Sequence, residues 1–118
     1  MPAITLGGIA VLEHKTPRMQ YRFRDPEYET LNDFDGPHTA RWAKGIVDRY
    51  RERILLIKNA KDERDFYAAK SLHFERLDGN RLHQHSMRLN IQWRLILELD
   101  KDGSATVVEI IKIEDYHK

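Results

Sequence analysis

The sequence contains no cysteine. This absence excludes disulfides, cysteine-based zinc sites and thiol catalysis, and it fits the reducing environment of the cytoplasm. Long hydrophobic runs are also lacking, since no stretch longer than residues 3–12 is apolar and that stretch contains Gly7 and Gly8. It is too short to span a membrane, and no basic region precedes it as in a signal peptide. We therefore expect no membrane partner, and the cysteine usage is compatible with a cytoplasmic protein.

A large excess of either charge is missing as well, because 20 Lys and Arg stand against 19 Asp and Glu. The net charge of +1 does not by itself indicate a nucleic-acid partner. The charges are nevertheless segregated along the chain. Residues 25–35 hold five acids and no Lys or Arg, whereas residues 41–64 hold eight Lys or Arg and four acids. This basic segment could follow nucleic acid or meet an acidic partner, or it could only keep the protein soluble.

The length of 118 residues, 41% of them hydrophobic, predicts one domain with a single core over residues 1–118. Within it, residues 1–18 form an additional N-terminal arm or strand in our interpretation. Apolar residues at helical spacing predict a long amphipathic helix that starts near residue 39, and a shorter helix over about residues 62–70. Residues 25–37 read as an acidic loop.

Alternating apolar and polar residues predict a series of strands. The expected strands are residues 20–24, 72–77, 84–90, 92–99 and 105–114. Two Asp-Gly pairs and a tight connection at residues 90–91 favour an antiparallel meander. The predicted class is therefore α+β, with an N-terminal strand and two helices packed on one face of a mostly antiparallel sheet of four to five strands.

The two-residue period of a strand assigns side chains to the two faces of this sheet. The side chains expected under the helices are Met87, Trp93 and Leu95. Arg88 is then left on the opposite, open face. His73 and Glu75 join it there, because Leu72 and Phe74 occupy the core side of their strand.

Metal-free RNA cleavage requires a base for the 2′-hydroxyl, cations for the charge that develops on the phosphate, and an acid for the 5′-oxygen. The candidates for these three roles are Glu75 or His73, Arg81 with Arg88, and Tyr116 with His117. The simpler alternative for any single histidine or arginine of a sheet surface is that it is only solvated.

Three further side chains have open roles. His83 and His85 lie two residues apart and could bind a metal ion, but two ligands do not make a site and we expect no metal. Arg94 could contact RNA, or it could only pair with Glu98 or with an acid at the edge of the core. No phosphate-binding glycine-rich loop or metalloprotease motif is present, and we expect no cofactor.

Four motifs near the C-terminal end of the chain occur in order. They are Leu72–Arg81, Gln84-His-Ser-Met-Arg-Leu-Asn90, Gln92-Trp-Arg-Leu95 and Glu114-Asp-Tyr-His117. This run resembles the HigB branch, the plasmid-maintenance killer type, of the RelE/ParE toxin superfamily. Members of that branch typically show a Leu-Lys-Gly-Asp-Arg turn, a Ser-Ile-Arg-Ile-Asn strand, a Gln-Trp-Arg strand start and an Asp-Tyr-His end.

The resemblance implies a toxin of a type II toxin–antitoxin pair that cleaves mRNA on the ribosome by 2′-hydroxyl attack, without metal. It also implies a HigA-like antitoxin with a helix-turn-helix domain, and binding of operator DNA only as the toxin–antitoxin complex. The positions that match the family's catalytic pattern are Arg81, Arg88, Asp115, Tyr116 and His117. RNA contacts are expected from Arg76, Arg81, Arg88 and Arg94.

The chain departs from the family pattern at two places. Asp78 stands where relatives commonly have Lys, and Glu75 stands where a HigB enzyme can have its catalytic His. Asp78 favours an alternative in which the protein is a noncatalytic binding module or a co-repressor with its antitoxin. A gyrase inhibitor of the ParE kind is a further alternative, against which the Asp-Tyr-His end argues.

Overall fold

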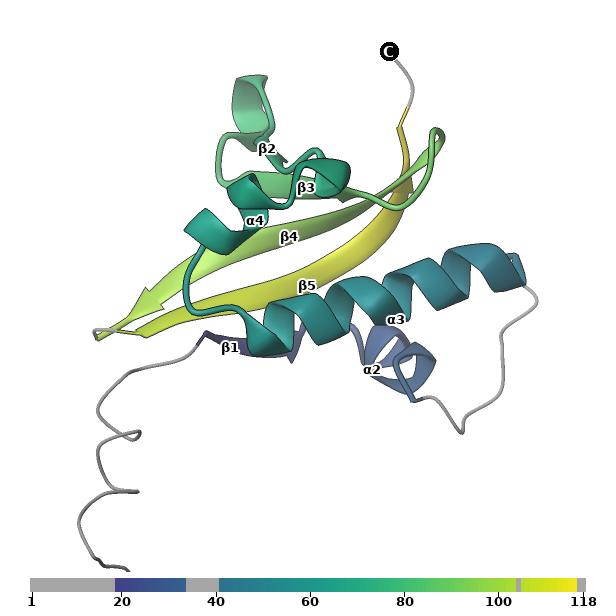
Figure 1. Ribbon diagram of the computed structural model, residues 1–118, viewed down its shortest axis with the longest axis horizontal. Coiled ribbons are helices and arrows are strands. Elements are labelled where there is room, and N and C mark those ends of the chain that lie inside the picture. The colour runs from purple at the N-terminus through teal and green to yellow at the C-terminus, as the bar shows by residue number, and fades with distance from the viewer. Residues whose placement is uncertain (1–18, 34–40, 104, 117–118) are drawn as a thin grey trace, which may run out of the picture.

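The computed structural model describes residues 19–33, 41–103 and 105–116. Its sheet has five strands in the order β1-β5-β4-β3-β2, with helices packed against one face (Figure 1). The α+β class predicted from the sequence is confirmed. The proposed arm of residues 1–18 and the candidate His117 lie outside the described residues. The elements are β1 (Gln20–Phe23), α2 (Pro26–Leu31), α3 (Lys44–Asn59), α4 (Arg64–Ala68), η1 (Lys70–Leu72), β2 (Glu75–Arg76), η2 (Gly79–Arg81), β3 (Gln84–Arg88), β4 (Trp93–Asp102) and β5 (Ala105–Asp115).

The meander of β2 to β5 is antiparallel throughout, as the turn signals predict. Its longest part is the β4–β5 hairpin, which closes at Gly103 with a positive φ of 66°. Only glycine adopts that conformation without strain. β1 adds to the far edge of the sheet and runs parallel to β5. The N-terminal strand therefore pairs with the last strand of the chain.

The core lies between the helices and one face of the sheet, and α3 makes the largest helical contribution. The buried residues of α3 include Val47, Tyr50, Ile54 and Ile57, and they pack with Met87, Leu95, Leu97, Val108 and Ile110 of the sheet. Tyr50 donates a hydrogen bond to the carbonyl of Tyr28 (2.7 Å), and the Tyr28 hydroxyl accepts one from the backbone of Ile113 (3.1 Å). These bonds tie α2, α3 and β5 together inside the core.

The acidic loop predicted over residues 25–37 was wrong at its start, because α2 forms there. The Asp25 side chain caps α2 by accepting from the Glu27 backbone N–H (2.9 Å), and Pro26 occupies the first turn. A capping aspartate, a first-turn proline and first-turn acids all stabilise a helix start. The negative charge that we read as a loop signal is thus also a helix signal.

The strand predicted over residues 72–77 is much shorter. Lys70–Leu72 forms the 3₁₀ turn η1, and only Glu75–Arg76 pairs with β3. Between them His73 takes a left-handed conformation with φ of 46°. The 84–90 strand ends at Arg88, and the 92–99 strand instead continues to Asp102.

Candidate active site

The open face of the sheet carries a group of polar side chains near the start of β4. The register pairs Glu75 with Ser86 and Arg88 with Arg94, and both pairs lie on the face opposite Met87. This placement agrees with the side assigned to Glu75 and Arg88 from strand periodicity. Several of the charged residues proposed from the sequence therefore lie near one another.

Arg94 is the buried centre of this group, with 6% of its surface exposed. Its Nε and Nη2 donate to the hydroxyl of the fully buried Ser86 (3.1 and 2.7 Å), and Nη2 also donates to the carbonyl of His73 (2.6 Å). Burial lowers the pKa of Arg94 from its ordinary value, but a guanidinium stays charged. Arg94 therefore acts as an internal clamp between β3, β4 and the segment before β2.

The proposed pairing of Arg94 with Glu98 was wrong. Glu98 instead accepts from Arg24 (3.0 Å) and Gln84 (3.2 Å), because the clamp turns Arg94 toward Ser86. Its small exposure also leaves Arg94 little surface for a direct contact with RNA.

The clamp fixes His73 in its left-handed conformation, and the His73 ring meets Arg88. The distance from Arg88 Nη1 to His73 Nε2 is 3.0 Å. A guanidinium can only donate, so Nε2 must be the accepting nitrogen. The contact therefore holds the His73 ring against Arg88.

Glu75 and Tyr116 meet across the edge of the group, although they are far apart in the chain. The Tyr116 hydroxyl donates to Glu75 Oε2 (3.3 Å), and the Arg94 guanidinium carbon lies 4.8 Å from the centre of the Tyr116 ring. The Tyr116 backbone N–H donates to the Gln92 carbonyl (2.7 Å), which fixes the end of β5 against the β3–β4 turn. A carboxylate, a phenol and a buried cation are thus in contact.

The other candidates are placed differently. Arg81 forms a two-pronged ion pair with Glu114 (2.8 Å for both bonds), which lowers the pKa of that carboxyl and raises the pKa of Arg81. Arg76 donates to the Leu82 carbonyl (2.8 Å) and lies on the other side of β2 from Glu75. Asp115 accepts from Gln92 (3.2 Å). Arg76 therefore lies outside the group, and the charge of Arg81 is balanced by Glu114.

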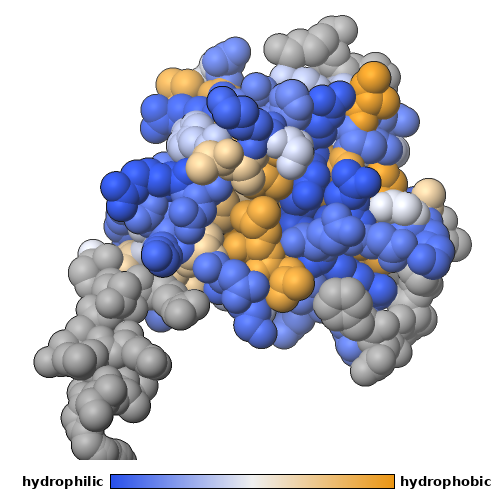
Figure 2. Space-filling model, viewed as in Figure 1, coloured by the Kyte–Doolittle hydropathy of each residue, from blue (hydrophilic) through white to orange (hydrophobic). Residues whose placement is uncertain are grey.

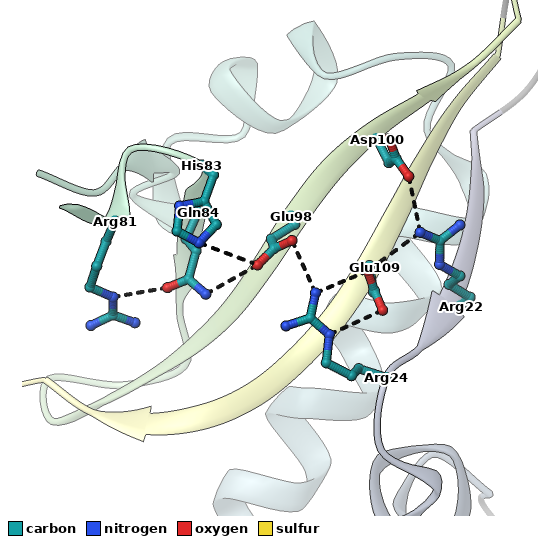
Figure 3. Close-up of polar contacts among 8 residues, drawn as sticks. All are labelled: Arg22, Arg24, Arg81, His83, Gln84, Glu98, Asp100 and Glu109. Carbon is teal, nitrogen blue, oxygen red and sulfur yellow. Dashed lines mark hydrogen bonds and ion pairs between the residues drawn. The ribbon is translucent and has the colours of Figure 1, made fainter.

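Ion pairs cover the rest of the open face (Figure 3). Arg22 contacts Asp100 (3.1 Å) and Glu109 (3.4 Å), while Arg24 contacts Glu98 (3.0 Å) and Glu109 (3.2 Å). Hydrogen bonds from Arg24 lower the pKa of Glu109. These cations are matched by carboxylates.

Sequence reasoning did not single out Arg53 of α3, which belongs to the basic segment of residues 41–64. Arg53 is 8% exposed and its Nε donates to the Arg88 carbonyl (3.0 Å). Helical periodicity could have indicated this burial, because the neighbouring Ile54 is one of the buried residues of α3. Within the described parts of the chain, Arg53, Arg88 and Arg94 form no ion pair with a carboxylate. Arg88 and Arg94 therefore place positive charge on the face of the sheet that carries Glu75.

The two histidines considered for metal binding lie in different surroundings. His83 approaches Glu98 (3.7 Å; Figure 3), whereas the His85 ring is buried and stacks on Phe74 with 5.0 Å between ring centres. Over the described ranges, no group of three His, Asp or Glu side chains is arranged to hold a metal ion. None of the described helices is long and apolar enough to cross a membrane.

Comparisons with known proteins gave structural similarity only. No family model and no curated protein matches the chain. Among solved structures, a YoeB/ParE toxin from Agrobacterium tumefaciens is similar over 85% of this chain and 99% of that one, with 17% identity and a TM-score of 0.46. The YoeB dimer from Staphylococcus aureus is similar over 87% and 99%, with 16% identity and a TM-score of 0.43. Both are similarities of overall fold at low sequence identity.

Proposed function

We propose that this protein is a metal-independent endoribonuclease, the HigB-type toxin of a type II toxin–antitoxin pair. The observation that carries the proposal is the contact of Tyr116 with Glu75 (3.3 Å) beside Arg88 and Arg94. Neither of these two cations is neutralised by an ion pair with a described carboxylate. The motif resemblance over residues 72–117 supports the same function.

In the proposed mechanism a base, a cation and an acid act at one place. Glu75 removes the proton of the RNA 2′-hydroxyl, which then attacks the neighbouring phosphorus. Arg88 stabilises the charge that develops on the phosphate oxygens. Tyr116 donates a proton to the departing 5′-oxygen, and His117 of the sequence motif is a second candidate for that step. The products are a 2′,3′-cyclic phosphate and a free 5′-hydroxyl.

Arg94 and His73 support these groups rather than act as the base. Arg94 is charged and buried beneath the Tyr116 ring, where water screens it little. The accepting nitrogen of His73 is engaged by Arg88 (3.0 Å), so proton abstraction by that nitrogen requires loss of the contact. We therefore assign His73 to the orientation of Arg88 and Glu75 to the base.

Arg81 and Arg76 take smaller parts. The bonds of Arg81 to Glu114 would have to break before it could bind a phosphate tightly. Arg76 lies across β2 from the cleavage site.

The proposed substrate is mRNA held by the translating ribosome in the cytoplasm. With a net charge of +1 and a small cationic area, the protein alone has few phosphate contacts to offer. A ribosome that holds the mRNA supplies the missing affinity.

The proposed antitoxin is a small HigA-like protein with a helix-turn-helix domain, and operator DNA is bound only by the complex. Exposed side chains of Leu55, Tyr67, Leu82 and Ile91 interrupt a hydrophilic surface. Figure 2 shows hydrophobic areas among hydrophilic ones on the face seen in Figure 1. An antitoxin segment with apolar and acidic side chains would complement such a surface.

Induction in cells, followed by mapping of mRNA ends, tests the proposal. Glu75→Gln and Tyr116→Phe should each lower cleavage by about 10²–10⁴-fold, because each removes a proton-transfer group. Glu52→Gln and Tyr21→Phe are matched controls at sites away from the group. Undiminished cleavage by both folded variants would refute the assignment, as would 5′-phosphate ends that require an added divalent ion.

A noncatalytic co-repressor is the second candidate, and Asp78 favours it. Asp78 precedes η2 with its carboxylate at a position where relatives commonly have Lys, so the cleavage site loses one cation. This function predicts that the protein binds its antitoxin and operator DNA without stopping growth. Co-purification with the antitoxin and an unchanged mRNA pool would favour it.

A further inference from the structure

A polar cavity lies between α4 and the strands β2 and β3, on the other side of β2 from Glu75. Its volume is about 410 Å³, within the range of small-molecule sites. Glu63, just before α4, and Tyr67 of α4 contribute to the lining, and the strands contribute Arg76 and His85. Arg76 and His85 are cross-strand partners, so their side chains lie side by side. The active-site proposal does not use this cavity.

Two opposite charges in this lining have no ion-pair partner among the described residues. Arg76 uses its Nε for the Leu82 carbonyl (2.8 Å), which leaves its two terminal nitrogens to face the cavity or solvent. Glu63 stands just before α4, and its side chain makes no capping hydrogen bond to the helix. Both charges reach His85, where Glu63 raises and Arg76 lowers its pKa against a larger lowering by burial. A carboxylate and a guanidinium therefore flank the same imidazole ring.

The two aromatic rings of the lining, those of Tyr67 and His85, both pack against Phe74. His85 is 9% exposed and stacks on Phe74 at an angle of 9° between the rings, and Tyr67 packs edge-on against the same Phe74 (4.8 Å). The Nδ1 atom of His85 is buried with no hydrogen-bond partner. A buried polar atom without a partner is costly. Tyr67 itself is 52% exposed, so an aromatic face remains free for a planar ligand.

We propose that this cavity binds a guanine base, with Tyr67 against its face, Arg76 at O6 and N7, and Glu63 at N1–H and the 2-amino group. Guanine presents two acceptors beside two donors, which matches a guanidinium beside a carboxylate. Adenine would place its amino group against Arg76 and an unprotonated nitrogen against Glu63. Both contacts are repulsive, so the lining discriminates between the two purines.

The guanine can belong to single-stranded RNA or to a free guanine nucleotide. Bases of unpaired RNA are commonly bound by aromatic stacking and by hydrogen bonds to their edges. Glu75 and Arg76 are consecutive residues whose side chains leave β2 on opposite sides. If the phosphate of a nucleotide lies at the candidate active site, its base therefore has to cross only β2, the edge strand, to enter this cavity. The guanine assignment itself does not depend on RNA cleavage.

Calorimetric titration of the full chain with GMP, AMP and CMP tests the assignment. GMP should bind at least about tenfold more tightly than AMP, as expected for one good bidentate contact. Glu63→Gln and Arg76→Met should each weaken GMP binding by about tenfold or more and reduce the preference over AMP. Glu52→Gln and Arg49→Met, on the exposed side of α3, are the matched controls. Equal binding of GMP and AMP, no binding of GMP, or equal losses in the controls would overturn the proposal.

Two further measurements locate the ligand and its source. GMP should shift the His85 ring resonances and leave those of His73 unchanged; the reverse pattern would also overturn the proposal. The oligonucleotide r(UUGUU) should bind more tightly than r(UUAUU), and Glu63→Gln should abolish the difference. Binding of r(UUGUU) above that of GMP assigns the base to RNA, and the opposite order assigns it to a free nucleotide. Glu75→Gln should keep GMP binding whatever its effect on cleavage, so the two proposals fail independently.

Discussion

Removal of the Ser86 hydroxyl should destabilise the protein more than a buried serine usually would. Ser86→Ala leaves two N–H groups of Arg94 without their acceptor inside the core. Hydrogen bonds to charged groups contribute about 1.5–3 kcal/mol each, and an orphaned charged donor costs at least as much. The remaining bond to the His73 carbonyl and partial entry of water offset some of this loss. We expect a decrease of roughly 2–4 kcal/mol in the free energy of unfolding.

A double-mutant cycle separates this clamp from a simple packing effect. Arg94→Met replaces the cation with an apolar side chain of similar length, so Ser86→Ala should cost little in that background. Urea unfolding followed by circular dichroism gives the four free energies, and the coupling should be about 1–3 kcal/mol. Additive losses would show that Ser86 and Arg94 do not depend on each other, and the clamp would then be refuted. Ser86→Ala should also weaken cleavage where folding is intact, because Arg94, which holds the His73 carbonyl, loses its own support from β3.

Three other substitutions test separate parts of the structure. Arg88→Ala should reduce mRNA cleavage by about 10²-fold or more with a loss of stability below about 1 kcal/mol, because the side chain lies on the open face; unfolding in a thermal melt would contradict that placement. Burial lowers the pKa of His85 below 6.5, so the folded state binds fewer protons and stability falls as pH drops below about 6.5; His85→Phe should remove this part of the dependence in urea titrations at several pH values. The Arg81 contact lowers the pKa of Glu114 below 4.5, so its contribution is present above pH 4.5 and lost as pH falls through the folded value. Arg81→Met should therefore lower stability at pH 7 and make the acid-induced loss smaller, and an unchanged acid profile would argue against the pair.

The fold was largely predictable because most of its elements obey local rules. Strand alternation and helical spacing located β3, β4, β5 and α3 within a few residues. The secondary-structure predictions failed where one local signal fits two structures, or where a contact with a distant residue determines the backbone conformation. The acids near Asp25 serve a helix cap as well as they would a loop, and the backbone at His73 bends out of strand geometry where Arg94 holds its carbonyl.

The face of the sheet on which the candidate site lies was predictable, but the contacts that its side chains make were not. Strand periodicity gave the side of the sheet for Glu75 and Arg88, because successive side chains of a strand point to opposite faces. The burial of Arg94 depends on Ser86, which is eight residues away on another strand. The ion pair of Arg81 with Glu114 spans 33 residues, and no local pattern marks it. Sequence reasoning therefore gave the face on which these charges lie and could not say which of them form ion pairs.

The pairing of β1 with β5 also has a consequence for synthesis of the chain. Arg22 and its partner Glu109 are separated by 87 residues, so β1 emerges long before the strand that completes it. At a translation rate of about 5–20 residues per second, the interval is roughly 4 to 17 s. During that time the N-terminal strand has no sheet to join, and its edge is available to any other chain with an unpaired strand. Arg22 of this strand and Arg24 just after it discourage such encounters until the matching carboxylates of β4 and β5 arrive.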